Sequence, residues 1–282
     1  MSSPQGDPTA RSSVLPVTRT VTRGRRRTTL RTEDGVAIEA AYEPCARGPQ
    51  AADGLAIVLA HGFSGGLLKP HVRRVAEAFT QFGAVITFSF RGHGRSGGRS
   101  TVGDREVLDL AAAVEWARSL GYGRVVTVGF SMGGSVVLRQ GALHGGRAEA
   151  RPDAVVAVSA PARWYYRGTP SMRRLHWVVT RRTGRIVGRH VLGTRIHPEE
   201  WDPVPLSPAE SVPLLAPAPV LVVHGDRDPY FPLDHPRMLA SAAPGVELWV
   251  ERGMGHAEHA AGAELLARIG SWATDRTTPG PA

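Results

Sequence analysis

Hydrophobic and polar positions alternate along most of the chain between two kinds of stretch. In the first kind, apolar residues follow one another almost without interruption, which is typical of strands buried on both faces of a sheet. In the second kind, apolar residues recur every three or four positions, which is typical of helices with one buried face. The apolar runs lie at residues 54–63, 84–90, 124–130, 153–161 and 218–225, and a last, more mixed strand is predicted at 245–251.

The helical stretches fall between these runs. They cover residues 69–83, 104–121, 131–144 and 258–273, and an antiparallel pair of strands is predicted at 27–44 around the turn at Asp34-Gly35. Strands that alternate with helices predict an α/β fold with a mostly parallel central sheet flanked by helices on both faces. In such a sheet, ligands bind beyond the carboxyl ends of the strands.

One segment, residues 162–208, interrupts this alternation. It lies between two predicted strands and is too long for a simple crossover, so we expect a small helical cap inserted over the site. The rest of the α/β core then falls in two parts, residues 26–161 and 209–275. Residues 1–25 are rich in Ser, Thr, Pro and Arg without periodicity, which predicts a disordered basic tail, and residues 276–282 are expected to form a flexible C-terminus.

The charge of the chain lies in two segments rather than over its whole length. The net charge is +9 in 282 residues, and only Lys69 among the basic residues is a lysine. Residues 1–31 hold seven arginines, and residues 161–197 hold nine arginines with no Asp or Glu. A basic chain raises the expectation of nucleic-acid binding. No motif of that class is present, however, so we expect no nucleic-acid partner.

The remaining composition excludes several classes. No apolar run reaches the roughly 20 residues that a membrane-spanning helix needs. The N-terminus has no basic region followed by an apolar core, so we expect no signal peptide. Cys45 is the single cysteine and cannot form an internal disulfide. A cytoplasmic location is therefore expected. No cluster of His, Cys and carboxylate residues has the spacing of a metal site, and we expect neither a metal nor a cofactor.

Candidate chemistry begins at the stretch Gly-Phe-Ser-Met-Gly, residues 129–133, which follows a predicted strand and opens a predicted helix. Glycines two positions before and after Ser131 allow the strand and helix to approach closely, so the hydroxyl is presented on a sharp turn. A serine needs a base to become a nucleophile, and the base needs an anion to orient it. His256 follows the last predicted strand, and Asp226 and Asp228 follow the preceding one.

With these motifs in order, the chain resembles an α/β-hydrolase of the Ser-Asp-His kind, in the branch of cap-bearing esterases, lysophospholipase-like enzymes and serine-aminopeptidase-like enzymes. The resemblance rests on "HGFSGG" at 61–66, "RGHGRSGG" at 91–98, "GFSMGG" at 129–134, "HGDRDPYFP" at 224–232 and "GMGH" at 253–256. It covers roughly residues 30–275. One departure is Ser89, where relatives often carry an Asp.

The resemblance implies a role for each site residue. Ser131 would be the nucleophile, Asp228 rather than Asp226 the acid, and His256 the base. The backbone amides of Phe63 and Met132 would form the oxyanion hole.

Other residues compete for these roles less strongly. Asp202 in the cap is a distant alternative for the acid, and His259 is an alternative for the base. His61 and His224 are expected to be hydrogen-bonded structural residues. His93 is expected either to be solvated or to fix its loop.

A serine in place of the Asp of haloalkane dehalogenases and epoxide hydrolases favours acyl transfer to water. We therefore expect a serine hydrolase that cleaves a carboxylic ester with an apolar acyl group, of the lysophospholipid or monoacylglycerol kind. An amide or peptide hydrolase would share every catalytic residue, and a non-catalytic ligand-binding homologue is the alternative outside enzymes.

In the cap, Met172, Leu175 and Val179 share one helical face, and the other face carries Arg174, Arg181 and Arg185. Two interpretations of the basic face remain open: a solvated surface, or contact with an anionic substrate or lipid surface. The oligomeric state is not predicted.

Overall fold

The computed structural model describes residues 24–48 and 54–278. Its centre is an eight-stranded sheet with the order β1-β2-β4-β3-β5-β6-β7-β8. The strands are β1 (Arg26–Arg31), β2 (Ala37–Glu43), β3 (Leu55–Ala60), β4 (Ala84–Phe88), β5 (Arg124–Phe130), β6 (Ala154–Val158), β7 (Val220–Gly225) and β8 (Glu247–Glu251). From β4 to β8 all neighbours are parallel, and β1 and β2 add an antiparallel edge. The predicted fold class is confirmed.

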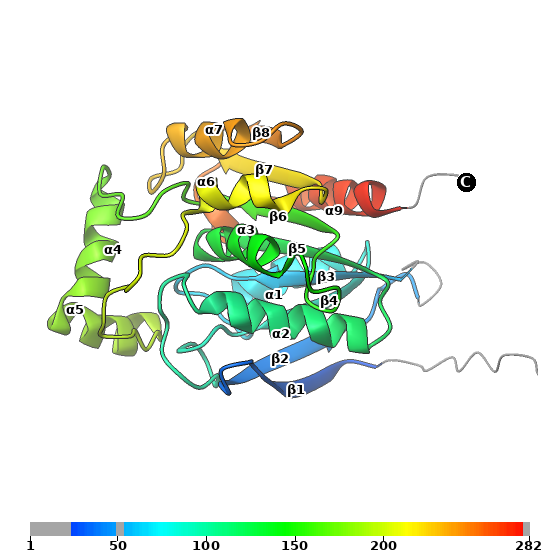
Figure 1. The fold of residues 1–282 in the computed structure, drawn as a ribbon, viewed down its shortest axis with the longest axis horizontal. Coiled ribbons are helices and arrows are strands. Elements are labelled where there is room, and N and C mark those ends of the chain that lie inside the picture. Colours follow the sequence, from blue (N-terminus) through cyan, green and yellow to red (C-terminus); the bar gives the residue numbers. More distant parts are fainter. Residues whose placement is uncertain (1–23, 49–53, 279–282) are drawn as a thin grey trace, which may run out of the picture.

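Helices cover both faces of this sheet (Figure 1). They are α1 (Pro70–Phe79), α2 (Glu106–Ser119), α3 (Met132–His144), α4 (Pro170–Thr180), α5 (Arg182–Val187), η1 (Gly188–Leu192), α6 (Pro208–Ser211), η2 (Val212–Leu215), α7 (Asp234–Ser241), α8 (Ala257–Ala260) and α9 (Ala263–Thr277). The apolar faces of α1 and α9 bury one core against the sheet, and α2, α3 and α7 bury the other. Because β3 to β7 are apolar on both sides, the sheet can only lie between two such layers.

The elements agree with the hydrophobic pattern except near two short breaks. The closing helix is divided into α8 and α9, because Ala261 and Gly262 adopt extended backbone angles between them. In the segment 162–208, the helix α4 ends at Thr180, and the backbone of Arg181 is extended. The expectation that Arg181 and Arg185 share a helix face with Arg174 is therefore wrong.

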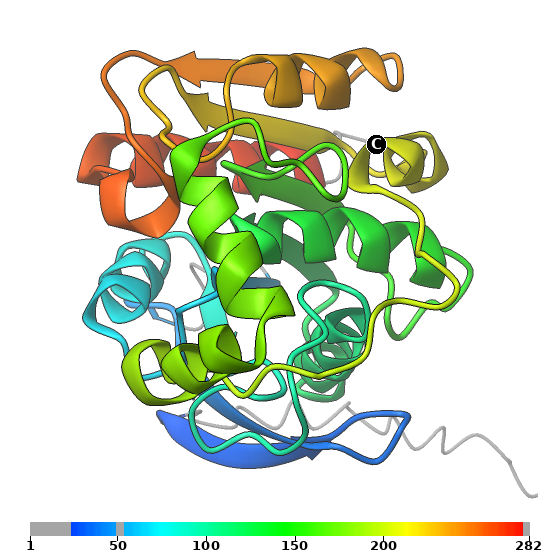
Figure 2. The same ribbon diagram turned by 90° about the vertical axis from the view of Figure 1, so that its left-hand side faces the viewer.

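The inserted helices lie at the carboxyl ends of the strands. Figure 1 shows α4 and α5 beyond the end of the sheet, and Figure 2 shows them crossing in front of it. The tail predicted for residues 1–25 lies almost wholly outside the described residues. At the other terminus, α9 continues to Thr277, so the segment predicted to be flexible overlaps its last turn.

Candidate active site

Ser131 occupies a strained turn between β5 and α3. Its backbone angles are φ 53° and ψ −115°, a region that non-glycine residues rarely adopt. The glycines on either side are a steric necessity, because a Cβ on Gly129 would collide with the carbonyl of Gly133, and a Cβ on Gly133 would collide with the carbonyl of Ala60. The amide of Ser131 donates to Val158 of the neighbouring strand at 2.9 Å. The hydroxyl is thus presented by a fixed backbone.

Three of the predicted side chains meet beyond the carboxyl ends of β5, β7 and β8. Nε2 of His256 lies 2.8 Å from Oγ of Ser131, and Nδ1 of His256 lies 2.7 Å from Oδ2 of Asp228. The other oxygen of Asp228 accepts hydrogen bonds from the amides of Tyr230 at 2.8 Å and Phe231 at 3.1 Å. A continuous chain of hydrogen bonds therefore runs from a buried carboxylate through an imidazole to the serine hydroxyl.

The carboxylate of Asp228 is fully buried yet remains acidic. Burial alone would raise its pKa, but the hydrogen bond and charge of His256 and the amides of Tyr230 and Phe231 lower it further, so the pKa lies below the ordinary 3.8. Asp228 is consequently anionic at neutral pH. An anion at this place orients the proton on Nδ1 of His256 and leaves Nε2 free to accept the proton of Ser131.

The competing residues lie elsewhere. Asp226 is exposed, and its carboxylate accepts the amide of Gly253 at 2.6 Å. His259 is exposed and stacks on His71 with ring centroids 3.9 Å apart. Asp202 lies exposed in the coil after η1, and the ring nitrogens of His256 bind Asp228 and Ser131 instead.

The remaining histidines near the site are buried. Nε2 of His61 accepts the amide of Phe90 at 3.0 Å, and burial together with neighbouring His93 lowers the pKa of His61 well below 6.5. Nε2 of His224 donates to the carbonyl of Phe231 at 2.8 Å. His93 has no exposed surface, so the first of its two expected roles, a solvated side chain, is wrong. Its Nδ1 lies 3.0 Å from the carbonyl of Arg91 in its own loop and its Nε2 lies 2.6 Å from the carbonyl of Phe63, which agrees with the second role of fixing the loop.

The loop after β3 is held so that one amide stays free. The carbonyl of Gly62 lies 2.7 Å from Nδ1 of His61, and the carbonyl of Phe63 also accepts the hydroxyl of Thr194 at 3.0 Å. Within residues 24–48 and 54–278, the amide of Phe63 has no protein acceptor. Met132 is the first residue of α3, so its amide is one of those that a helix cannot satisfy internally. Phe63, Ser131 and Met132 all line one cavity.

A mostly apolar cavity of about 220 Å³ opens beside Ser131. Its walls come from the core loops and from the insertion, and the apolar part is formed by Phe63, Met132, Met172, Leu175, Val179 and Ile196. The aromatic side chains of Trp164 and Trp201 pack edge to face at 5.0 Å along another wall. The predicted apolar face of α4 therefore faces this cavity.

Charged residues surround the cavity unevenly. Arg163 lines it but is paired with Asp234 at 2.7 Å, whereas Arg167 is exposed. Arg185, which also lines it, donates to the carbonyl of Thr180 at 3.0 Å. Glu199 and Glu200 also line the cavity. They add negative charge next to the segment 161–197, which has no Asp or Glu.

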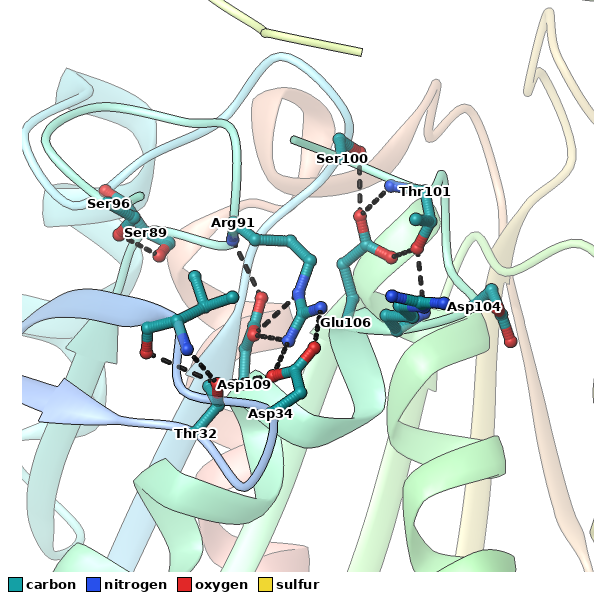
Figure 3. Close-up of polar contacts among 12 residues, drawn as sticks. Thr32, Asp34, Ser89, Arg91, Ser96, Ser100, Thr101, Asp104, Glu106 and Asp109 are labelled. Carbon is teal, nitrogen blue, oxygen red and sulfur yellow. Dashed lines mark hydrogen bonds and ion pairs between the residues drawn. The ribbon is translucent and has the colours of Figure 1, made fainter. Parts of the chain in front are cut away.

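The loop after β4 is fastened by a buried ion pair (Figure 3). The guanidinium of Arg91 binds Asp109 on α2 at 2.7 Å and Asp34 in the β1–β2 turn at 2.7 Å. These carboxylates raise the pKa of Arg91 even though its burial opposes the charge. The arginine therefore stays charged and joins three segments that are distant in sequence.

Ser100 and Thr101 of the same loop line the cavity, and Glu106 holds both of them (Figure 3). This buried carboxylate accepts the hydroxyls of Ser100 and Thr101, each at 2.7 Å, and the amides of Thr101 and Gly103. The indole of Trp201 donates to the carbonyl of Thr101 at 2.7 Å and fixes the coil after η1 against it. Sequence reasoning missed these residues, because no local pattern marks a carboxylate whose partners lie in a distant loop.

Ser89 has a defined place despite its departure from the usual Asp. Its hydroxyl donates to Glu39 at 2.7 Å and accepts the amide of Leu67 at 3.0 Å. It therefore ties the end of β4 to the loop after β3 and makes no contact with Ser131, Asp228 or His256.

Comparison with known proteins decides the family. Residues 57–269 match the alpha/beta hydrolase family. The chain belongs to that family. This α/β-hydrolase is 29% identical over 235 residues to a monoacylglycerol lipase of Mycolicibacterium smegmatis. The matched region covers 71% of this chain and 80% of the lipase.

Solved structures agree on the fold of this α/β-hydrolase. An esterase of Pyrococcus furiosus superposes with a TM-score of 0.65 at 23% identity, over 88% of this chain and 91% of the esterase. An α/β serine hydrolase without lid from Xanthomonas campestris superposes with a TM-score of 0.61 at 20% identity, over 92% of this chain and 97% of that protein. Both superpositions therefore agree with the sheet and helix arrangement described above.

Neither a metal-binding cluster nor a membrane-spanning helix occurs in the described part of the chain. No group of three or more His, Cys, Asp or Glu side chains in residues 24–48 and 54–278 is arranged to hold a metal ion. In the same part of the chain, no helix has both the length and the apolar character to cross a membrane.

Proposed function

We propose that this α/β-hydrolase is a serine esterase that cleaves a carboxylic ester with an apolar acyl group through an acyl-enzyme. The observation that carries the proposal is the hydrogen-bonded chain from Asp228 through His256 to Ser131, because it ends at the wall of an apolar cavity. A non-catalytic binding protein has no need to keep a buried anion, an imidazole and a strained serine in this order.

The geometry supports a two-step reaction. Oγ of Ser131 attacks the ester carbonyl carbon while its proton moves to Nε2 of His256, and the amides of Phe63 and Met132 bind the developing oxyanion. The tetrahedral intermediate then expels the alcohol, which takes the proton from His256. Water attacks the acyl-enzyme with His256 again as the base, and the carboxylic acid leaves Ser131 with its proton restored.

The cavity supports the choice of substrate. Its apolar side chains suit an acyl chain, and burying each methylene contributes about 0.8 kcal/mol. Glu199, Glu200 and exposed aromatic Tyr165 lie at more polar parts of the wall, where an alcohol group could be bound. The similarity to a monoacylglycerol lipase supports a monoacylglycerol as the substrate, and a lysophospholipid is the related alternative. Amide or peptide hydrolysis is the second candidate, because the same three side chains serve both reactions.

An anionic lipid surface is the proposed second partner. The insertion exposes five arginines on α4, α5 and η1 and the segment between them, namely Arg173, Arg174, Arg181, Arg182 and Arg189. It also exposes the apolar side chains of Trp177, Ile186 and Val191. Basic groups beside exposed apolar groups suit the surface of an anionic membrane.

Covalent labelling tests the proposed nucleophile. A fluorophosphonate should modify the protein once, at Ser131, and Ser131→Ala should abolish both labelling and hydrolysis of p-nitrophenyl butyrate. The matched control is Ser135→Ala, because Ser135 lies one helical turn further along the same wall and its hydroxyl only donates to the carbonyl of Met132. Labelling of the Ser131→Ala protein at the parent rate would refute the assignment. A panel of esters and matched amides then separates the two candidate reactions.

A further inference from the structure

Glu258 is a buried carboxylate that the proposed reaction does not use. It lies on the short helix α8, two residues after His256, and its side chain is only 4% exposed. Its Oε1 accepts a hydrogen bond from the amide of Gly62 at 3.0 Å. Burying a carboxylate is unfavourable unless its partners compensate for the lost water, so this side chain calls for a specific role.

The hydrogen bond from Gly62 to Glu258 holds the loop after β3 close to Ser131. Gly62 immediately precedes Phe63, whose free amide is the proposed oxyanion donor. A Cβ built on Gly62 would lie 3.2 Å from Oε1 of Glu258 and 3.5 Å from Cβ of Ser131. The carboxylate, the Gly62 backbone and Ser131 are therefore packed in succession. A shift of Glu258 would move the Phe63 amide relative to the serine.

The backbone that carries Glu258 is itself fixed. The guanidinium of Arg74 on α1 donates to the carbonyl of Glu258 at 2.6 Å and to that of Ala261 at 2.8 Å. The amide of Ala257, which has a positive φ of 54°, donates to the hydroxyl of Ser159 at 3.0 Å. The carboxylate thus extends from a rigid support, which is what a group needs in order to hold another segment in place.

We infer that Glu258 is a positioning residue that sets the distance between the oxyanion loop and Ser131 by holding the amide of Gly62. The inference rests on the proposed function. The carbonyls of the loop are held by other side chains, that of Gly62 by His61 and that of Phe63 by His93 and Thr194. Glu258 holds the amide of Gly62. His71 lies near the same carboxylate, with Nε2 3.8 Å away, but this nitrogen has no hydrogen-bond partner among the described residues.

Three substitutions separate reach from charge. Glu258→Gln keeps the length and an acceptor oxygen but removes the charge. Glu258→Asp keeps the charge but withdraws the acceptor by about one carbon–carbon bond, roughly 1.5 Å. Glu258→Ala removes both. Glu264→Ala is the matched control, because Glu264 is exposed in the first turn of the neighbouring helix α9.

We would measure kcat and KM on p-nitrophenyl butyrate and the melting temperature of each variant. The concentration of active sites used to calculate kcat comes from complete titration with a fluorophosphonate. Displacement of a catalytic group by about 1 Å costs up to 100-fold. We expect kcat to fall about 10- to 100-fold in Glu258→Asp and Glu258→Ala with KM within about threefold. Glu258→Gln and Glu264→Ala should keep kcat within about threefold of the parent.

Two patterns would overturn the inference. If kcat of Glu258→Asp equalled that of the parent, the length of the side chain would not matter. If kcat also fell in Glu258→Gln, the role would belong to the charge of Glu258. A fall in melting temperature with unchanged kcat in every variant would leave only a structural role. Failure of the parent protein to react with the fluorophosphonate would instead refute the proposed function, and the inference with it.

Discussion

His235 provides a prediction whose size follows from the structure. It lies on α7 with no exposed surface, and its Nδ1 accepts the amide of Ala162 at 3.0 Å where the insertion begins. Its ring packs against the rings of Tyr166 and Phe231. Burial, followed by the charge of Arg163, lowers the pKa of His235 from 6.5 to about 4. The folded protein therefore keeps this ring neutral where the unfolded chain would protonate it.

The sign and size of the effect follow from proton linkage. Between about pH 6.5 and 4 the unfolded chain binds a proton that the folded protein does not, so the stability that depends on His235 is lost as the pH falls through this window. A change from pH 7 to pH 5 covers about 1.5 pH units of this window, from 6.5 down to 5. At about 1.4 kcal/mol per unit, this lowers the free energy of unfolding by about 2 kcal/mol.

The test compares the parent with His235→Asn. The Asn side chain offers an oxygen near the position of Nδ1, so it can still accept the amide of Ala162, and it does not titrate. Urea unfolding followed by tryptophan fluorescence at pH 7 and pH 5 should show a loss about 2 kcal/mol smaller in the variant than in the parent. The control His190→Asn replaces an exposed ring on η1 and should lose as much stability as the parent.

We expect the variant to be less stable than the parent at pH 7, because a ring is removed from a packed site, and this offset cancels in the comparison between pH values. Equal losses in His235→Asn and in the parent would refute the reasoning, since the proton would then be taken up by other groups.

Two further predictions concern the site and the insertion. Asp228→Asn should lower kcat on the order of 10⁴-fold, because the amide cannot fix the tautomer of His256. The kcat of Asp226→Asn should stay within about threefold of the parent. A large loss in Asp226→Asn with a small loss in Asp228→Asn would show that the acid is misassigned. Replacing four exposed arginines by Gln should lower kcat/KM on ester in anionic vesicles but not on a neutral short-chain ester, and added salt should reproduce this in the parent. Equal losses on both substrates would indicate a damaged insertion instead. The four are Arg173, Arg174, Arg181 and Arg182.

Much of the fold could be predicted from local pattern. The runs that became β3 to β7 are apolar at nearly every position, and only a sheet covered on both faces can bury such strands. The break between α8 and α9 could not, because Gly262 follows a segment whose path is set by contacts of Arg74 with two carbonyls. Hydrophobic periodicity does not register a backbone held by a distant side chain.

The candidate site divides in the same way. Gly129, Ser131 and Gly133 are set by a local steric requirement, so the sequence by itself determined the turn and its hydroxyl. It also predicted which strand ends carry the proposed acid and base, because parallel strands bring their carboxyl ends to one edge.

Only the tertiary structure decided which carboxylate meets His256, which amide of the loop stays free, and that Glu258, Glu106 and Arg91 hold the surrounding loops. Each of these depends on side chains that meet across many residues of sequence, such as the 196 positions between Gly62 and Glu258. The free energy of burying such a charge is set by its partners in space, and a linear sequence contains the partners but not their distances.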